Sequence, residues 1–280
     1  MTTPGTGANR PGGPETTRPG GKGGSWGPGR TLLVVIGVLI AVAAIGLGAL
    51  TVIGSLAHET AKHTGRYDGI RTVDVDVDSG SVAVTGVDDS TTTVRRTVSW
   101  SLRKPKIQER QEGDRLVVRV DCSFSFGQGC GGHFEIRVPR ATDLRLHSSA
   151  GRVEVRGTDG SVDASSSAGR VSATDIGGQA TLQSSAGTVE GSRLRSALVD
   201  AQSSAGSVRL AFATAPERVQ ASSSAGSVDV VVPRDATAYR VEASTSAGSS
   251  DVTVRTDPGS DRQIDAHSSA GSVRVRYASD

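Results

Sequence analysis

The side chains able to carry out acid–base chemistry are few in this chain and lie far apart along it. The five histidines are His58, His63, His133, His147 and His267. His147 and His267 occupy equivalent outward positions in repeats six units apart, which at about 4.8 Å per strand predicts a separation of roughly 29 Å. Imidazoles so far apart cannot share a site, so we expect no histidine-based catalytic centre.

Carboxylates and serines are the other candidates for catalysis. Asp159, Asp175 and Asp200 could line one edge of successive repeats, and glycoside cleavage needs two acids about 5 to 9.5 Å apart. Aspartates in Thr-Asp-Gly turns are usually solvated, however, which favours a structural role. A serine that recurs in every repeat is a poor nucleophile candidate, because nothing singles out one copy for activation. We therefore predict that the protein is not an enzyme.

Cys122 and Cys130 lie eight positions apart in a glycine-rich segment that could bring their sulfur atoms together. In an oxidising compartment we expect a disulfide between them, which would add about 2 to 3 kcal/mol of stability. A metal site with His133 as a third ligand is the open alternative, although this spacing matches no standard zinc motif.

The same segment contains Gly127-x-Gly129-x-x-Gly132, a pattern also found in dinucleotide-binding loops. Such a loop needs a strand before it and a helix after it, so that the phosphates reach the helix N-terminus. Here both flanks, residues 116–120 and 134–138, are strand-like. The glycines are therefore interpreted as a hairpin connection, and we predict no bound cofactor or metal.

These residues lie in or beside a repeated sequence. Ser-Ala-Gly recurs seven times, each time just before an alternating apolar run. The repeat glycines, predicted to be structural turn residues, are Gly151, Gly169, Gly187, Gly206, Gly226, Gly248 and Gly271. Their spacing of 18 to 23 residues is typical of a solenoid in which every repeat forms one rung. An eighth repeat, without the alanine, surrounds Gly80.

Aligning the repeats on the glycine produces columns of similar residues. The columns seven and five positions before it are apolar or small, the column three before it is Ser or Thr, and the column two after it is mostly Val. A strand alternates faces with period two, so this change of parity requires a corner at the glycine. Glycine suits a corner because it adopts positive φ without a Cβ clash.

The same alignment assigns a side to each residue of the Ser-Ala-Gly motif. We expect the alanine to point inward and the middle serine, such as Ser149 or Ser269, to face solvent. The serines three positions before the glycine are expected to be buried, with hydroxyls that bond to each other or to nearby backbone groups.

The predicted fold is all-β: a single-chain, β-helix-like solenoid of about eight rungs that carries a β-sheet insertion and follows one transmembrane helix. The insertion corresponds to the less repetitive stretch between Ser90 and Arg140. The predicted boundaries are a disordered cytoplasmic tail at 1–30, the transmembrane helix at 31–57, a linker at 58–70 and the repeat domain at 71–280.

The transmembrane prediction rests on 27 uncharged residues between Thr31 and Ala57. As a helix they would extend about 40 Å, which exceeds the roughly 30 Å thickness of the hydrocarbon core. A cleaved signal peptide is the alternative, but its apolar region is usually shorter. Basic residues on the N-terminal side, including Arg30 next to the span, place the tail in the cytoplasm and the repeats outside.

Charge excludes one class of partner. Residues 1–57 carry four basic residues against one acidic, whereas the remainder carries 27 basic and 28 acidic residues. The repeat domain therefore lacks the excess positive charge of a nucleic-acid-binding protein, and we predict no nucleic-acid partner.

Residues 134–140, Phe-Glu-Ile-Arg-Val-Pro-Arg, followed by the repeat at 144–155, resemble the bacterial putative-adhesin family, a domain of unknown function built from β-strand repeats. Its members pair a Val-Pro-Arg/Lys segment with Ser-Gly-x-Val turns, often behind a membrane anchor, and a second such segment is present at 231–234. The similarity spans roughly 71–280, although this chain has Ser-Ala-Gly where Ser-Gly-Asp is common. An excess of Arg over Lys, with many Ala, Gly and Val residues, suggests an actinobacterial source.

Two classes of function fit these observations. The first is a non-catalytic cell-envelope module, anchored in the lipid bilayer by residues 31–57, whose strand faces contact envelope polymer, a surface protein or another copy of itself. The second is an envelope-sensing subunit that signals through its cytoplasmic tail. A polysaccharide-cleaving β-helix enzyme is a weaker third alternative, because aromatic residues for sugar stacking are scarce.

Overall fold

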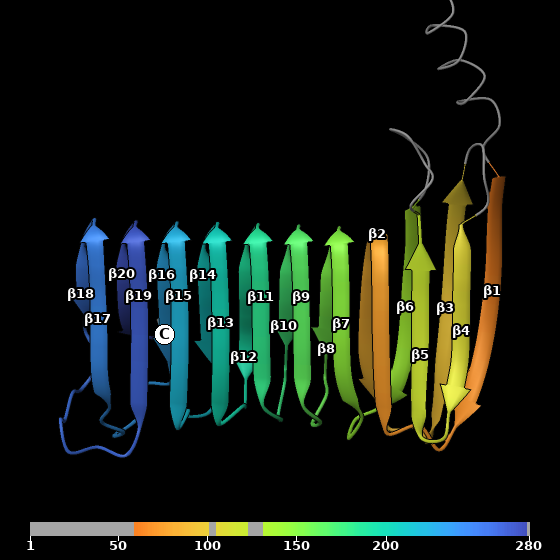
Figure 1. The fold of residues 1–280 in the computed structure, drawn as a ribbon. Helices are drawn as coiled ribbons and strands as arrows, with labels where there is room; N and C mark the ends of the chain where they lie inside the picture. The colour runs from red at the N-terminus through yellow and green to blue at the C-terminus, as the bar shows by residue number, and fades with distance from the viewer. Residues whose placement is uncertain (1–58, 101–104, 123–130, 279–280) are drawn as a thin grey trace, which may run out of the picture. The chain divides into compact units, whose positions relative to one another are not determined.

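The computed structural model describes residues 59–100, 105–122 and 131–278 of the 280-residue chain (Figure 1). The chain divides into two compact units, Met1–Val52 and Ile53–Asp280, and the first lies wholly outside the described residues. The predicted tail at 1–30 and span at 31–57 therefore stay predictions. Within the described ranges no helix is long and apolar enough to cross a membrane.

Two long sheets face each other across a thin core in the described unit. In spatial order the first sheet contains β4 (Lys106–Glu112), β5 (Arg115–Asp121), the first half of β2 (Thr72–Val87), β7 (Asp143–Ala150), β9 (Val162–Ala168), β11 (Ala180–Ala186), β13 (Leu198–Ala205), β15 (Arg218–Ala225), β19 (Gln263–Ala270) and β17 (Arg240–Ala247). The second contains β1 (Glu59–Asp68), β3 (Thr91–Trp100), β6 (Gly131–Pro139), the second half of β2, β8 (Val153–Arg156), β10 (Val171–Thr174), β12 (Val189–Leu194), β14 (Val208–Phe212), β16 (Val228–Val232), β20 (Val273–Tyr277) and β18 (Ser250–Val252).

Each repeat places one strand in each sheet and turns between them at its glycine, which confirms the predicted solenoid and corner. The φ angles of the seven repeat glycines lie between 149° and 157°. A Cβ on Gly169 would lie only 1.8 Å from the carbonyl oxygen of Gly151 in the neighbouring rung. The corner therefore needs glycine both for its backbone conformation and for the close approach of adjacent rungs.

The core consists of the inward columns that the alignment predicted. In the rung formed by β11 and β12, Ala180, Leu182 and Val189 are fully buried, and equivalent positions are buried in the other inner rungs. Small residues fill this core because the two sheets lie close together near the corner. The aromatic Phe134 is buried at the end of the stack where β1, β3 and β4 extend the two sheets.

The rungs do not stack in the order of the sequence. β19 and β20 lie between the rung of β15 and β16 and the rung of β17 and β18, so the penultimate repeat is the outermost one (Figure 1). At the other end, β2 lies between the rung of β5 and β6 and the rung of β7 and β8. Column alignment establishes which residues are equivalent, but it carries no information on which rung is adjacent to which.

Nine rungs stack within the described ranges, one more than predicted, because β5 and β6 form a rung of their own. These two strands belong to the stretch that we expected to be a β-sheet insertion. Of that stretch only β3 and β4 fit the expectation, since they pair antiparallel at the end of the stack, β3 with β1 and β6 and β4 with β5. Most of residues 58–70, expected to be a linker, form β1.

A buried ion pair closes this end of the core. Arg96 Nη1 of β3 lies 2.7 Å from Glu109 Oε2 of β4, and the Glu109 side chain is only 6% exposed. The hydroxyl of Tyr67 in β1 donates a hydrogen bond of 2.5 Å to the other carboxylate oxygen. Burial, reinforced by this bond to Glu109, raises the pKa of Tyr67 to about 12. The cluster joins the two sheets and holds β1 and β3 in place.

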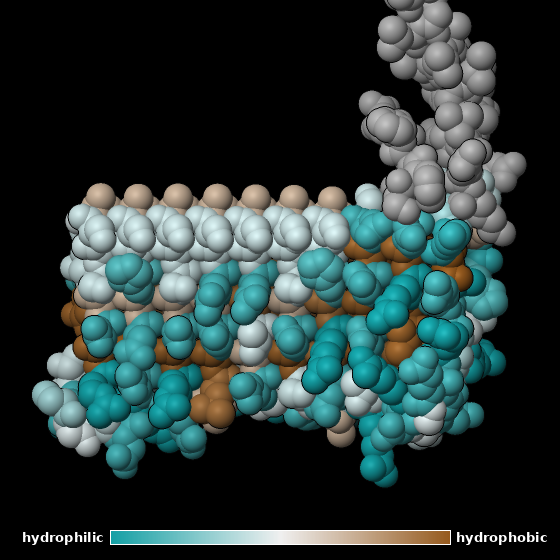
Figure 2. Space-filling view, viewed as in Figure 1, coloured by the Kyte–Doolittle hydropathy of each residue, from teal (hydrophilic) through white to brown (hydrophobic). Residues whose placement is uncertain are grey.

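The repeated alanine is exposed, so the prediction that it points inward is wrong. All seven alanines line the outer ridge of the solenoid, visible as a pale brown row along the upper edge in Figure 2. They are Ala150, Ala168, Ala186, Ala205, Ala225, Ala247 and Ala270. The two sheets converge at the corner, and the buried serine two positions earlier already closes the core. A residue beyond that serine has no opposing wall to pack against.

Candidate interaction surface

A shallow groove of about 460 Å³ runs along the first sheet, across the rungs and just below the alanine ridge. We call it the serine groove, and its serines belong to the whitish band beneath the ridge in Figure 2. Its outward-facing lining residues are His147, Ser165, Ser167, Gln183, Ser185, Gln202, Ser204, Ser222, Ser224, His267 and Ser269. Equivalent side chains recur at the inter-strand distance of about 4.8 Å.

The serines beneath this groove are structural. Each buried hydroxyl donates a hydrogen bond to the carbonyl oxygen of the repeat glycine in a neighbouring rung, as Ser184 does to Gly169 at 2.9 Å and Ser203 does to Gly187 at 2.8 Å. The prediction that these hydroxyls bond to backbone groups is confirmed. Each of these hydroxyls makes the same bond to a carbonyl at the corner. No copy is therefore set apart from the others as a nucleophile.

The two repeat histidines mark the ends of the serine groove. His147 Nδ1 lies 3.0 Å from Ser165 Oγ, and His267 Nδ1 lies 3.0 Å from Ser244 Oγ, each in the adjacent rung. Because β19 lies directly beside β15, the histidines are five rungs apart and not six as predicted. The expected separation falls to about 24 Å, which still excludes a shared catalytic centre.

The other predicted histidines lie elsewhere. His133 is on the second sheet, where its ring nitrogens lie 2.5 Å from Ser81 Oγ and 3.2 Å from Glu135 Oε1. His63 is exposed on β1, and His58 lies outside the described residues.

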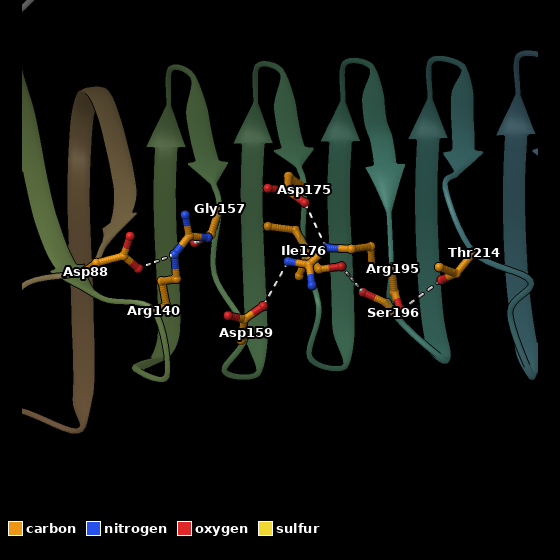
Figure 3. A network of polar contacts seen from close by, with 9 residues as sticks. All are labelled: Asp88, Arg140, Gly157, Asp159, Asp175, Ile176, Arg195, Ser196 and Thr214. Atoms are coloured by element: carbon orange, nitrogen blue, oxygen red, sulfur yellow. Dashed lines mark hydrogen bonds and ion pairs between the residues drawn. The ribbon is translucent and has the colours of Figure 1, made fainter.

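Two of the three candidate aspartates do come together, but an arginine neutralises them (Figure 3). Arg195 lies 2.8 Å from Asp159 Oδ1 through Nη2 and 2.8 Å from Asp175 Oδ1 through Nε. These bonds, with the one to Asp175 the stronger influence, raise the pKa of Arg195. Asp200 lies apart on the first sheet, where Gln202 Nε2 donates to its carboxylate at 3.0 Å. Because one guanidinium group holds both carboxylates, we interpret the three side chains as a structural link across three rungs.

Further hydrogen bonds fix the same edge of the solenoid. Arg140 Nε donates to Asp88 Oδ1 at 2.7 Å, and its Nη1 donates to the Gly157 carbonyl at 3.1 Å. The hydroxyl of Ser196 donates to the Ile176 carbonyl at 3.1 Å (Figure 3). The Gly157 carbonyl gains a donor in this way, and the Ile176 carbonyl accepts a second hydrogen bond besides the one from the Arg195 amide at 2.8 Å.

The cysteine prediction falls partly outside the described residues. The amide of Cys122 donates to Asp78 Oδ2 at 2.8 Å, immediately after β5, whereas Cys130 lies outside the described residues. The disulfide between them therefore stays a prediction. Within the described parts of the chain, no group of three His, Cys, Asp or Glu residues is arranged to hold a metal ion.

A second polar depression was not predicted from the sequence. It has a volume of about 490 Å³ and lies on β1, β3 and β6 of the second sheet and on the turn after β2. We call it the arginine pocket; its lining residues are Thr64, Arg66, Val87, Asp89, Thr91, Thr93, Arg95 and Arg137. The lining residues of β1 and β3 belong to no repeat, and only the antiparallel pairing of β1 with β3 and of β3 with β6 brings them beside Arg137.

Comparison with known proteins gives a family and a set of distant solved structures. A family described as Toastrack DUF4097 matches residues 68–280. No curated protein matches the chain.

Solved structures with low identity align with most of the chain. A putative cell adhesion protein from Clostridium sporogenes ATCC 15579 is 9% identical, and the alignment covers 79% of this chain and 100% of that one with a TM-score of 0.35. A putative adhesin from Bacteroides fragilis NCTC 9343 is 15% identical and one from Parabacteroides merdae ATCC 43184 is 11% identical, each covering 79% of this chain and 97% of the other, with TM-scores of 0.36 and 0.39.

Proposed function

Since the chain belongs to the Toastrack DUF4097 family, we propose that it is a non-catalytic cell-envelope module, anchored in the membrane by residues 31–57 and exposing its β-solenoid outside. The solenoid presents flat strand faces and shallow grooves suited to adhesion or interaction. The proposed partners are the lipid bilayer, through the anchor, and an envelope polymer or surface protein.

The observation that carries the non-catalytic part is the state of the candidate catalytic groups. Asp159 and Asp175 are both held by Arg195 at 2.8 Å, and the repeated serines donate to backbone carbonyls. Groups committed to structural bonds in this way are poorly placed to attack or protonate a substrate. The long polar faces remain available for binding.

The anchoring part rests on the sequence, and topology mapping tests it. The full chain, with an epitope tag at each end, is expressed in bacterial cells, and intact cells are treated with a protease. The C-terminal tag should be lost and the N-terminal tag retained, whereas permeabilised cells should lose both. Protection of both tags in intact cells would contradict the proposed orientation.

The signalling alternative is favoured by the proline-flanked Thr16-Thr17 pair in the predicted cytoplasmic tail. Deletion of residues 1–30 separates the two functions. A surface module should retain binding to the envelope and its cellular effect without the tail, whereas a sensing subunit should retain binding and lose the effect.

A further inference from the structure

The arginine pocket has the donor set of an anion-binding site. Pairing across the second sheet puts Arg66 of β1 opposite Thr93 of β3, and Thr93 opposite Arg137 of β6. Arg95 is two residues further along β3 on the same face. Adjacent strands are about 4.8 Å apart, so the Cα atoms of Arg66 and Arg137 are about 10 Å apart and the three side chains can reach one group between them.

The arginines of the pocket are not held in ion pairs within the described residues. Arg66, Arg95 and Arg137 have no ion-pair partner there, whereas Arg140, Arg195 and several other arginines do. Asp89 is the one acid among the lining residues, and its Oδ1 accepts the amide hydrogen of Thr91 at 3.2 Å. Glu135 of β6 lies opposite Arg95, and Asp68 lies two residues beyond Arg66 on β1, but their carboxylates bond to His133 and Thr91 instead. The three guanidinium groups therefore keep N–H donors that an anionic ligand would engage.

The chemistry of the donors selects among anions. A guanidinium group presents its N–H donors as a planar fork that matches phosphate oxygens, and a phosphate group accepts hydrogen bonds from several directions at once. Thr64 and Thr93, on the same face as the arginines, add neutral hydroxyl donors. Three arginines on three adjacent strands of one sheet face fit a phosphate carried on a larger molecule.

We propose that the arginine pocket binds a phosphate group of a phosphodiester, carried either by an envelope polymer or by a lipid headgroup. Arg66, Arg95 and Arg137 are the binding residues. The proposal deepens the proposed function by naming a ligand chemistry and rests on it for the setting alone. β1 begins directly after the predicted span, so either source of phosphate is within the reach of an anchored domain.

The test uses the full chain in micelles of an uncharged detergent, with two probes. The first is a fluorescent glycerol phosphate oligomer, whose binding is followed by fluorescence anisotropy. The second is phosphatidylglycerol added to the micelles, with phosphatidylcholine for comparison, and the lipid that co-purifies with the chain is measured. The variant R66Q/R95Q/R137Q should weaken the binding of at least one probe tenfold or more.

The matched control is R152Q/R218Q/R255Q, which removes the same charge from exposed positions away from the pocket. It should change binding less than twofold, and the unfolding transitions of both variants should coincide with that of the original chain. Oligomer binding without lipid co-purification identifies the polymer as the source, and the reverse identifies the headgroup. Binding of neither probe, or equal losses in the two variants, would overturn the proposal. The assay needs no cellular topology, so it can fail while the topology experiment succeeds.

Discussion

At the residue scale, the corner between the sheets depends on a reciprocal set of contacts. The amide of Gly187 donates to the Ala205 carbonyl of one neighbouring rung at 2.9 Å, and its own carbonyl accepts the Ser203 hydroxyl of that same rung at 2.8 Å. The glycine conformation and the serine hydroxyl therefore serve one purpose. They let successive rungs approach closely while both the amide and the carbonyl of the corner glycine keep a partner.

Gly187→Ala should destabilise the chain by about 3 kcal/mol or more, because it combines a strained φ with a backbone clash. The added Cβ would lie 1.9 Å from the Gly169 carbonyl oxygen at a φ of 157°. Gly113→Ala is the control, since Gly113 also has positive φ, at 64°, but no atom lies within 4 Å of the new Cβ. Its cost should be about 1 to 2 kcal/mol. Urea unfolding measures both, and equal costs would contradict the close-approach argument.

Removing one buried hydroxyl should have a smaller, defined effect. Ser184→Ala leaves the Gly169 carbonyl without its 2.9 Å bond, so we expect a loss of about 1 to 2 kcal/mol in the free energy of unfolding. Ser185→Ala, one residue further along in the exposed serine groove, should change stability by less than about 0.5 kcal/mol. A larger loss for Ser185→Ala would mean that the roles of the two columns are reversed.

At the scale of the elements, the exchanged order of the last rungs agrees with their charges. Arg274 of β20 lies between Asp229 of β16 and Asp251 of β18, and Arg209 of β14 is opposite Asp229. Stacking in sequence order would instead put Asp229 beside Asp251. Each cross-strand pair of opposite charge contributes about 0.2 to 1 kcal/mol, and like charges opposite each other are destabilising. The observed order produces an alternating ladder on the second sheet.

Cysteine cross-linking tests this order directly. In the structure His267 is opposite both Ser222 and Ser244, so the pairs S222C/H267C and S244C/H267C should form disulfides under mild oxidation. S222C/S244C should not, because those Cα atoms are separated by two strand spacings of about 4.8 Å, beyond the roughly 7 Å limit for a disulfide. Mass spectrometry of digested protein identifies the linked peptides. A link in S222C/S244C alone would show that the rungs stack in sequence order.

The parts of the fold that could be predicted are those encoded locally. The position of Gly151 in its repeat determines the corner, and the alternation around Val153 determines which face is buried. The order of the rungs could not be predicted, because every repeat presents the same edges to its neighbours and only distributed charges, such as Arg274, favour one arrangement. The exposure of Ala150 was also not predicted. The alternation of a strand gives the side on which a residue lies, but not whether the opposite sheet extends far enough to cover it.

The candidate site shows the same division. The serine groove follows from repeat columns, so its residues could be recognised as outward-facing from the sequence. The arginine pocket could not be found in this way, because Arg66 and Arg95 come from β1 and β3, which belong to no repeat. Their proximity depends on antiparallel pairing at the end of the stack, which no local pattern specifies.

At the scale of the whole domain, each inner rung contacts only its two neighbours, so stability should be close to a sum over rungs and their interfaces. The repeat from Arg170 to Gly187 is 18 residues long and lies within the stack. Its removal joins Gly169 to Thr188 and keeps every column in phase. The cost is one rung interface, together with the contact of Asp175 to Arg195.

The deletion of 170–187 should therefore leave a folded chain with a cooperative unfolding transition, shifted to a lower midpoint by the loss of one rung. Deletion of 170–186 is the control, because it is only one residue shorter but changes the alternation parity at the junction. A one-residue slip turns a buried face toward solvent, so this variant should lose cooperative unfolding and its native β-sheet circular dichroism. If the two deletions behaved alike, the rungs would not be interchangeable units, and stability would have to depend on contacts beyond adjacent rungs.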